Sequence, residues 1–388
     1  MTPLSRRLIW SFRGASLVTL LVAFVYCALP APPVPLVERK PGASSAWEIL
    51  NETIPEFDTI DLRIDNFLVP DHVDTTYICQ AYELPRYSNY QIIKYDTIPD
   101  QAAVMHHLVV FNCARPRPQG AENFFECPSM PDDCTELVSA WGLGGDMLAY
   151  PDDVGDELGR NTGKINLVAQ AHYDNPTLLS GVRDSTLTRF WITNKLRPKD
   201  ASFLTMGLRT RHIAIPPGQK DFTLGASCPS PKTEADPYAN LNFFSEFWDG
   251  ATQDTFAWLY APHMHKLGTQ FWAERYYQNG TFKDYFGQQN PYLFDYQVPH
   301  FYEHDPIHQG RVLLDPTDTY KFYCRYDTRD KTSTTMGGDR TQDEMCLFFM
   351  GYYPTTPAVL KDKGLEWCLG APFCEGGADT CGFEHYPF

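Results

Sequence analysis

The sequence predicts an all-β protein built from two consecutive antiparallel β-sandwich domains of jelly-roll-like type. Short runs in which apolar and polar residues alternate follow one another along the chain, and Pro, Gly, Asn and Asp separate them. Aromatic residues make up 14% of the chain, and its 31 prolines favour sheets joined by rigid turns over helices. No long helical stripe and no repeat of fixed period is found, so two sandwiches are the simplest interpretation.

The predicted strands are rich in β-branched and aromatic residues. An Asn-Gly turn at Asn279-Gly280 adds a hairpin signal. In chain order the clearest strand segments are TTYICQAYELP (75–85), HHLVVFNC (106–113), KINLVAQAHYDN (164–175), TRFWITNKL (188–196), FLTMGL (203–208), TFAWLYAPHMH (255–265), TQFWAERYYQNGTF (269–282), YKFYCRYDT (320–328) and MCLFFMGYYP (345–354).

A domain boundary is expected near residue 198. The segment NKLRPKDASF is polar, basic and proline-containing, and it divides the strands into two sets of similar size. We therefore expect sandwiches over 46–197 and 198–370, and a short tail over 371–388 that a Cys374–Cys381 loop pins. Residues 31–45, rich in Pro, Ala and Ser, are interpreted as a linker.

The first thirty residues have the layout of a secretory signal. Arg6, Arg7 and Arg13 precede an apolar stretch over 14–29, which small residues and prolines follow. A retained signal anchor is the alternative, because the apolar run is short and no cleavage site stands out. Either way we expect the remaining chain to be lumenal or secreted, with membrane contact only through this segment.

Net charge and cysteine content agree with that compartment. The formal charge of −16 argues against nucleic acid as a partner. Cys27 lies in the signal, and the remaining even number of cysteines predicts five disulfides in an oxidising compartment. Asn51 and Asn279 begin triplets that accept N-glycans. The ten cysteines are Cys79, Cys113, Cys127, Cys134, Cys228, Cys324, Cys346, Cys368, Cys374 and Cys381.

Five histidines form the strongest chemical signal. His263 and His265 lie two apart on a predicted strand, which projects both imidazoles from one face. His106 and His107 are adjacent and would point to opposite faces of a regular strand. They can serve one metal only if the strand is irregular there, or if they bind through different ring nitrogens. His172 follows in QAHYDNP.

The other histidines carry a weaker signal. His300, His304 and His308 lie in a proline-broken acidic loop, and a third metal site there is not favoured. His72, His212 and His385 are interpreted as ordinary side chains. On its own, Met345 would be interpreted as core filler on a strand.

Taken together, the ordered segments VMHHLVVFNC, QAHYDNP, PHMHKLG and DEMCLFFMGYYP resemble the copper type II, ascorbate-dependent monooxygenases. Supporting segments are TYICQAYELP, AIPPGQKDF and the stretch from Cys324 to Cys346. The resemblance runs from about Phe57 to Pro354. It implies an enzyme with two copper ions per chain, O2 as co-substrate and ascorbate as reductant. It also implies that the two domains flank a solvent-filled cleft.

The resemblance assigns six copper ligands. His106, His107 and His172 would hold one copper in the first domain, and His263, His265 and Met345 the other in the second domain. Three imidazoles suit a copper that stores and passes an electron. The thioether of Met345 is a soft ligand that favours Cu(I), so the second centre is where oxygen activation and C–H cleavage are expected. Zinc is the rival metal, but two histidines with a methionine suit it poorly.

The resemblance also implies disulfides and one further contact. The implied pairs are Cys79–Cys127, Cys113–Cys134, Cys228–Cys368 and Cys324–Cys346. Since Cys346 adjoins Met345, its bridge would help to fix that ligand's backbone. Gln170 matches a glutamine of the peptide-amidating branch and could lie near the first copper, although an ordinary strand residue is an equal interpretation.

Three apolar positions favour one branch of the family. Where the peptide-amidating enzymes bind their substrate's carboxylate, this chain has Ala261, Leu347 and Phe349, which cannot pair a buried charge. QAHYDNP and the PPG motif over 216–218 look closer to the dopamine β-hydroxylase-like branch. That implies a small apolar substrate, such as an arylalkylamine, hydroxylated at a benzylic-type carbon. The short segment between signal and core leads us to expect no additional N-terminal domain, which that branch usually carries.

Two alternatives stay open on the sequence alone. One is an amidating enzyme with a carboxylate clamp placed elsewhere, which ascorbate consumption with a glycine-extended peptide would distinguish from an arylethylamine hydroxylase. The other is a non-catalytic secreted copper-binding protein on the same scaffold. The sequence does not indicate an oligomeric state.

Overall fold

The structure is a computed structural model that describes residues 56–374, apart from residues 88, 121–123, 231–239 and 362. The predicted signal, the linker, Asn51, Cys381 and His385 lie outside the described residues. No helix in the described part of the chain is long and apolar enough to span a membrane.

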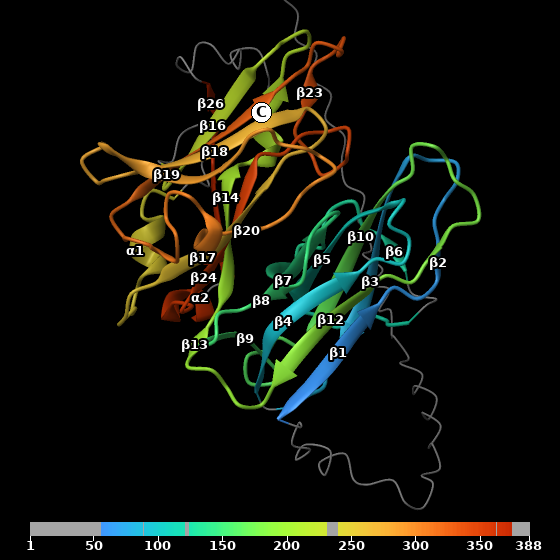
Figure 1. The fold of residues 1–388 in the computed structure, drawn as a ribbon, viewed down its shortest axis with the longest axis horizontal. Coiled ribbons are helices and arrows are strands. Elements are labelled where there is room, and N and C mark those ends of the chain that lie inside the picture. Colours follow the sequence, from blue (N-terminus) through green and yellow to red (C-terminus); the bar gives the residue numbers. More distant parts are fainter. Residues whose placement is uncertain (1–55, 88, 121–123, 231–239, 362, 375–388) are drawn as a thin grey trace, which may run out of the picture. The chain divides into compact units, whose positions relative to one another are not determined.

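Strands β1 to β13 form the first sandwich (Figure 1). One sheet has the order β1(Phe57–Arg63), β12(Leu187–Thr193), β4(Tyr90–Ile98), β9(Val154–Leu158) and β13(Lys199–Asp200), with β8(Leu148–Ala149) paired to β4. The other has the order β6(Phe125–Glu126), β3(Thr75–Glu83), β10(Asn166–Asp174), β5(Met105–Cys113) and β7(Cys134–Gly142). A small ribbon pairs β11(Arg183–Asp184) with β2(Phe67–Leu68).

Strands β14 to β26 form the second sandwich. One sheet has the order β20(His300–Phe301), β17(Phe256–His263), β24(Leu347–Tyr353), β14(Ser202–Leu208) and β25(Trp367–Gly370), with β21(Val312–Leu313) on β17. The other has the order β19(Phe282–Gln289), β18(Gly268–Tyr276), β22(Thr319–Tyr326), β16(Phe222–Cys228) and β26(Phe373–Cys374). A ribbon pairs β15(Ala214–Ile215) with β23(Thr335–Met336).

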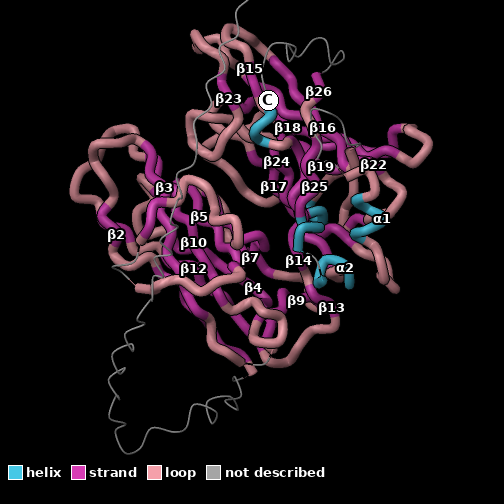
Figure 2. Tube along the Cα trace, turned by 180° about the vertical axis from the view of Figure 1, so that it is seen from behind, coloured by secondary structure: helices cyan, strands magenta, loops and turns pink. Residues whose placement is uncertain are grey.

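Helical turns are few and short. They are α1(Phe243–Phe247), α2(Pro357–Lys361) and the 3-10 turns η2(Thr210–His212), η3(Tyr302–His304) and η4(Lys363–Glu366). Figure 2 shows α1 and α2, in cyan, beside strands of the second sandwich. The predicted all-β class with two sandwiches is confirmed.

Each sandwich has its own apolar core, and alternation along the strands explains how it forms. On β22 every second residue is buried, so Tyr320, Phe322, Cys324 and Tyr326 face inward. They pack with aromatic side chains such as Phe348 from β24. Strands such as β10 and β14 are instead buried on both faces. The sheets that carry the candidate site are therefore rigid supports.

One buried ion cluster braces the first sandwich. Lys164 Nζ lies 2.7 Å from a carboxylate oxygen of Glu136 and 2.7 Å from one of Asp156, and all three side chains are at most 4% exposed. Burial alone would lower the pKa of the Lys164 ammonium, but the carboxylates outweigh it and raise that pKa. The cluster touches none of the candidate metal ligands and is structural.

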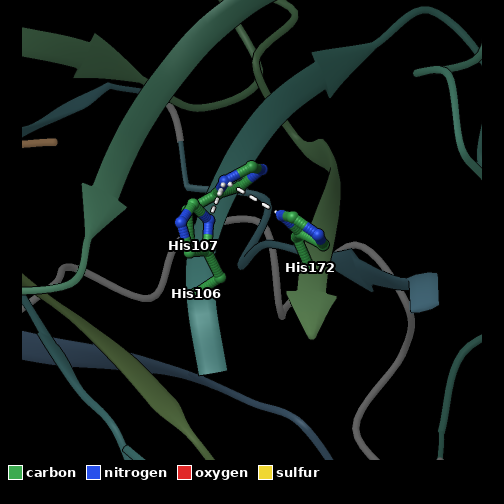
Figure 3. A group of neighbouring side chains, drawn as sticks. All are labelled: His106, His107 and His172. Atoms are coloured by element: carbon green, nitrogen blue, oxygen red, sulfur yellow. Dashed lines mark hydrogen bonds between the residues drawn. The ribbon is translucent and has the colours of Figure 1, made fainter. Parts of the chain in front are cut away.

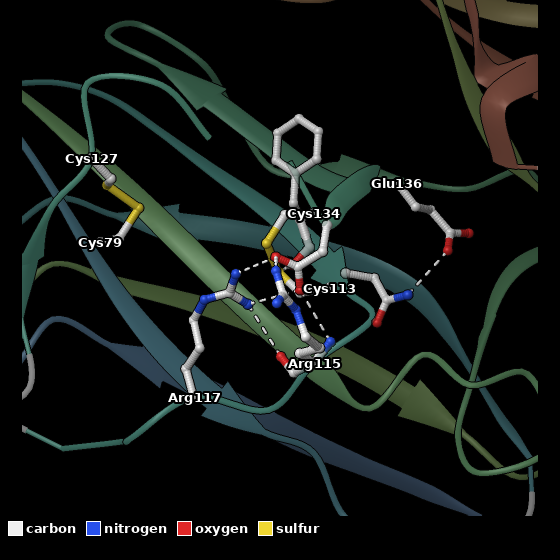
Figure 4. Close-up of a disulfide and its surroundings, with 10 residues drawn as sticks. Cys79, Cys113, Arg115, Arg117, Cys127, Cys134 and Glu136 are labelled. Atoms are coloured by element: carbon white, nitrogen blue, oxygen red, sulfur yellow. Dashed lines mark hydrogen bonds and ion pairs between the residues drawn. A yellow bond between two sulfur atoms is a disulfide. The ribbon is translucent and has the colours of Figure 1, made fainter. Parts of the chain in front are cut away.

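The structure contains the four disulfides that the resemblance implied. They are Cys79–Cys127 and Cys113–Cys134 in the first sandwich, and Cys228–Cys368 and Cys324–Cys346 in the second. Figure 4 shows the first two, with Arg115 and Arg117 beside them; both guanidinium groups pair with Asp133. The expected Cys374–Cys381 pair stays a prediction, because Cys381 is outside the described residues. Asn279 lies exposed in the turn between β18 and β19, accessible to a glycan.

Candidate metal centres

The first centre comprises His106, His107 and His172, on two strands that are hydrogen-bonded neighbours. His107 on β5 is the cross-strand partner of His172 on β10. Met105 pairs with Tyr173, so His106 is an extra residue on β5, and the register shifts there. Such a bulge turns one side chain out of the regular alternation. This irregularity is the condition under which two adjacent histidines can face one metal.

The three imidazoles meet through their Nδ1 atoms, as Figure 3 shows. Nδ1 of His107 lies 3.2 Å from Nδ1 of His106 and 3.4 Å from Nδ1 of His172. Two imidazole nitrogens bound to one first-row metal at about 2 Å lie roughly 3–4 Å apart. The spacing therefore fits a metal ion. Among the described residues this is the one group of histidines, cysteines and carboxylates whose ligand atoms converge in this way.

The outward nitrogens of two of these rings are hydrogen-bonded. His106 Nε2 lies 3.1 Å from the backbone oxygen of Phe294, and His172 Nε2 lies 2.9 Å from Oγ1 of Thr341. The ring of Tyr77 stacks on His172 with centroids 4.1 Å apart. These contacts orient the rings and leave Nδ1 of each free to bind a metal.

The second centre comprises His263, His265 and Met345. His263 ends β17, and His265 follows two residues later, with ring centroids 5.2 Å apart. Here the Nδ1 atoms are occupied by the protein. His263 Nδ1 lies 2.8 Å from Oε1 of Gln297, and His265 Nδ1 lies 2.9 Å from the backbone oxygen of Asp343. Nε2 is therefore the nitrogen that each ring offers to a metal.

Met345 lies two residues before the start of β24 and is held on both sides. Its backbone oxygen accepts a hydrogen bond of 2.7 Å from the Tyr326 hydroxyl, and Cys346 is bonded to Cys324. The buried carboxylate of Glu344 accepts hydrogen bonds from the backbone N–H of His265 at 2.9 Å and of Leu267 at 2.7 Å. Burial raises the pKa of Glu344 to about 8, and these N–H groups act against that rise. Glu344 therefore ties the His265 turn to the chain at Met345.

All five histidines are kept neutral by their surroundings. Burial, and after it the nearby His265, lower the pKa of His263 to about 3, while the hydrogen bond to Gln297 acts in the opposite direction. Burial, followed by the neighbouring histidines, places the pKa values of His107 and His172 well below 6.5. Burial also lowers the pKa values of His106 and His265. Neutral imidazoles with a free nitrogen are ready metal ligands at neutral pH.

Both centres border one cavity of about 270 Å³. The His107 and His263 rings are 6.2 Å apart between centroids, so the centres adjoin. The expected cleft is therefore present, but at the histidines it is narrow. Apolar side chains dominate its wall, and Asp339 is the one carboxylate among the described residues that line it. The lining includes Tyr77, Val109, Phe111, Met130, Leu137, Trp141, Phe203, Leu259, Ala261, Met345, Leu347 and Phe349.

Several residues singled out in the sequence lie elsewhere or have other contacts. His300 stacks on Tyr260, and His308 Nε2 lies 2.9 Å from the backbone oxygen of Tyr285. His304 lies in η3, and His72 is exposed. His212 is buried in η2. None of these joins a metal-binding group in the described chain.

Gln170 borders the cavity, yet its Nε2 donates a 2.7 Å hydrogen bond to the backbone oxygen of Cys127. That contact ties β10 to the disulfide loop and supports the structural interpretation of this residue. Ala261, Leu347 and Phe349 all line the cavity, so the apolar trio faces the site.

Apart from the Cys324–Cys346 bridge beside Met345, sequence reasoning missed the residues that hold the ligands or line the cavity beside them. Glu344 is adjacent to Met345, and an acidic residue beside a ligand was a usable signal. Phe294, Gln297, Asp339 and Thr341 lie in loops without periodicity, and their contacts depend on the folded chain. No pattern in the sequence marks them.

Comparisons with known proteins agree on one family. Residues 60–180 match the N-terminal domain, and residues 199–364 the C-terminal domain, of the copper type II ascorbate-dependent monooxygenase family. The chain is 29% identical to dopamine beta-hydroxylase of Rattus norvegicus, over 82% of this chain and 50% of that protein.

Further similar proteins give the same picture. DBH-like monooxygenase protein 2 of Mus musculus is 29% identical over 83% of this chain and 49% of its own length. Tyramine beta-hydroxylase of Caenorhabditis briggsae is 27% identical over 76% of this chain and 49% of its own length. The chain thus spans about half the length of these relatives.

Proposed function

Because the chain belongs to the copper type II ascorbate-dependent monooxygenase family, we propose that it hydroxylates a C–H bond of a small apolar amine, using O2 and ascorbate. The overall reaction takes R–H, O2, two electrons and two protons to R–OH and water, with ascorbate as the source of the electrons. The observation that carries the proposal is that the two candidate metal centres border one apolar cavity.

The donor atoms fit copper at both centres. Three neutral imidazoles, His106, His107 and His172, would hold one ion, and His263, His265 and Met345 the other. Copper supplies one-electron redox chemistry, and a thioether ligand favours its reduced state. A zinc hydrolase is disfavoured because thioether ligation is poor zinc chemistry and Asp339 is the one described carboxylate on the cavity wall.

The chain's own contribution is to bind and orient the substrate. The apolar part of the cavity wall includes Trp141, Leu347 and Phe349. An apolar group of the substrate that packs against these side chains displaces water from them, which stabilises the complex. Asp339, whose carboxylate pairs with the Ser129 hydroxyl, is the group on this wall that can pair with an ammonium. A substrate with an apolar body and one basic nitrogen, such as an arylalkylamine, matches both features. Two of the similar proteins, dopamine beta-hydroxylase and tyramine beta-hydroxylase, are named after amine substrates.

We place the protein in the secretory pathway, either secreted or lumenal. Four disulfides in the described chain support this compartment, because such bonds persist where the surroundings are oxidising.

The test is ascorbate-dependent O2 uptake by the copper-loaded chain, with product identified by mass. An arylethylamine should be hydroxylated, and a glycine-extended peptide should not. Turnover of the peptide instead would establish the amidating alternative, and full copper loading without turnover of any substrate would favour a copper-binding protein.

Asp339→Asn tests the amine contact. Since a hydrogen bond to a charged group is worth about 1.5–3 kcal/mol, KM for the amine should rise by roughly 10- to 100-fold. A neutral substrate analogue without the amine should show little change between Asp339→Asn and wild type. An equal effect on both substrates would show that Asp339 acts on the fold and not on the ammonium.

A further inference from the structure

We propose that the second sandwich completes the first metal centre, with Thr341 as a positioning residue that fixes the ring of His172. This inference rests on the proposed function to the extent that the first centre binds copper. The Nε2 atoms of His106 and His172 point away from the centre, and the partner of each comes from the second sandwich. His106 Nε2 contacts the Phe294 backbone oxygen, and His172 Nε2 contacts the Thr341 hydroxyl.

The Phe294 contact fixes which nitrogen of His106 carries the proton. A carbonyl oxygen can only accept, so Nε2 of His106 must be the donor. Nδ1 of the neutral ring is then unprotonated and faces Nδ1 of His107 at 3.2 Å. The Phe294 ring also stacks on His106, with centroids 4.1 Å apart. The loop between β19 and β20 thus holds both the tautomer and the orientation of this ligand.

Thr341 acts on His172 from a second loop. Its Oγ1 lies 2.9 Å from His172 Nε2 and 3.4 Å from the Tyr77 hydroxyl, and Thr341 is 2% exposed. With Oγ1 accepting from Nε2–H, Nδ1 of His172 is left free towards His107. Since His172 and Thr341 are both buried, water cannot readily replace the hydroxyl if it is removed.

The hydrogen bonds on the two histidines of the second centre come from their own sandwich. His263 is held by Gln297 and His265 by Asp343, both of which belong to the same sandwich as the ligands. Loops of the second sandwich therefore hold two rings of the first centre, whereas both rings of the second centre are hydrogen-bonded within the second sandwich. Displacing the second sandwich should weaken metal binding at the first centre more than at the second.

The experiment isolates the first centre by working in a Met345→Ala background, in the full chain with one copper bound. Loss of Cu(I) to a bathocuproine chelator is timed, and the Cu(II) form is examined by EPR. In this background Thr341→Val, which keeps the shape and removes the hydroxyl, should lose copper at least about 10-fold faster and shift the EPR parameters. Thr341→Ser, which keeps the hydroxyl, should show the same rate of copper loss and the same EPR parameters as the Met345→Ala parent.

Trp367→Phe is the matched control. The Trp367 indole N–H donates to the backbone oxygen of Thr135 at 3.0 Å, a contact between the two sandwiches that involves no histidine. The Trp367→Phe substitution should leave the rate of copper loss unchanged. Equal rates in Thr341→Val and its parent would overturn the inference, as would equal acceleration by Thr341→Val, Thr341→Ser and Trp367→Phe. A Met345→Ala chain that binds no copper would overturn the inference and the proposed first copper site together.

Discussion

The first centre takes its ligands from two hydrogen-bonded strands, whereas the second takes them from the end of one strand and a loop more than seventy residues away in sequence. The first presents Nδ1 atoms inward and has its outward nitrogens held by the other sandwich. The second has its Nδ1 atoms held within its own sandwich and offers Nε2. The two candidate centres thus offer opposite ring nitrogens, and their rings come as close as 6.2 Å between the centroids of His107 and His263.

This difference indicates where each centre is vulnerable. In the first centre the spacing of the ligands along the strands depends on strand register, with His106 in a bulge, whereas the orientation of two of its rings depends on loops of the second sandwich. The second depends on side chains that hold loops, chiefly Glu344 and Gln297. Local substitutions should therefore perturb the second centre without unfolding its sheet.

Removing one ligand from each centre should have the largest effect. Met345→Ala and His172→Ala should each reduce hydroxylation to background, because the proposed reaction needs one electron from each of the two centres. The two should differ under reduction: Met345→Ala should still accept an electron at its histidine centre, which rapid-mixing EPR would detect. Substantial turnover in either variant would show that one centre suffices.

Glu344→Gln should loosen the second centre. The amide has one acceptor oxygen in place of two, so one of the N–H groups of His265 and Leu267 loses its partner. Copper affinity there should fall by roughly 10- to 100-fold. Titration with a Cu(I) chelator would measure this, and the histidine triad provides the internal reference. An equal fall at both centres would mean that Glu344 supports the fold generally.

A smaller change is expected at Gln297. Gln297→Leu removes the acceptor on His263 Nδ1, while Gln297→Glu retains an oxygen there. Copper affinity at the second centre should fall by about 10-fold in the first variant and less in the second. If the two substitutions weaken binding equally, the hydrogen bond does not set the orientation of His263.

The metal-free chain should lose stability as pH falls. His263 has a pKa of about 3 when folded and near 6.5 when unfolded, so the unfolded state binds more protons between those values. Above about pH 6.5 both states are neutral and the effect vanishes. Each such histidine contributes at most about 1.4 kcal/mol per pH unit below that point. Urea unfolding at pH 6.5 and 5.5 would measure the fall in the free energy of unfolding. In His263→Gln that free energy should depend less steeply on pH.

The sequence predicted the fold class well because many strands, such as β18 and β22, alternate with period two. It did not single out β7 or β16. Their residues are buried on both faces, so alternation is absent, and β16 carries Gly and Ala. The six proposed ligands were found through ordered motifs. Alternation along a strand was expected to place His263 and His265 on one face, but β17 ends at His263, so His265 lies beyond the strand. Alternation could not place His106, whose position depends on a bulge.

The hydrogen bonds that orient the rings of the first centre could not be predicted. Thr341 meets His172 across 169 residues of sequence, and Phe294 meets His106 across 188. Such contacts depend on how two separate sheets pack, and no local pattern encodes them. Asp339 was not predicted for the same reason: its place on the wall of the apolar cavity, on which its proposed role depends, exists only in the folded chain.

The most direct test of the two-centre account is the copper content of the purified chain and of two single-ligand variants. Wild type should bind about two copper ions, whereas Met345→Ala and His107→Ala should each bind about one, and the two variants should differ in their Cu(II) EPR spectra. A chain that takes up zinc in preference to copper, or variants that both retain two ions, would contradict the account.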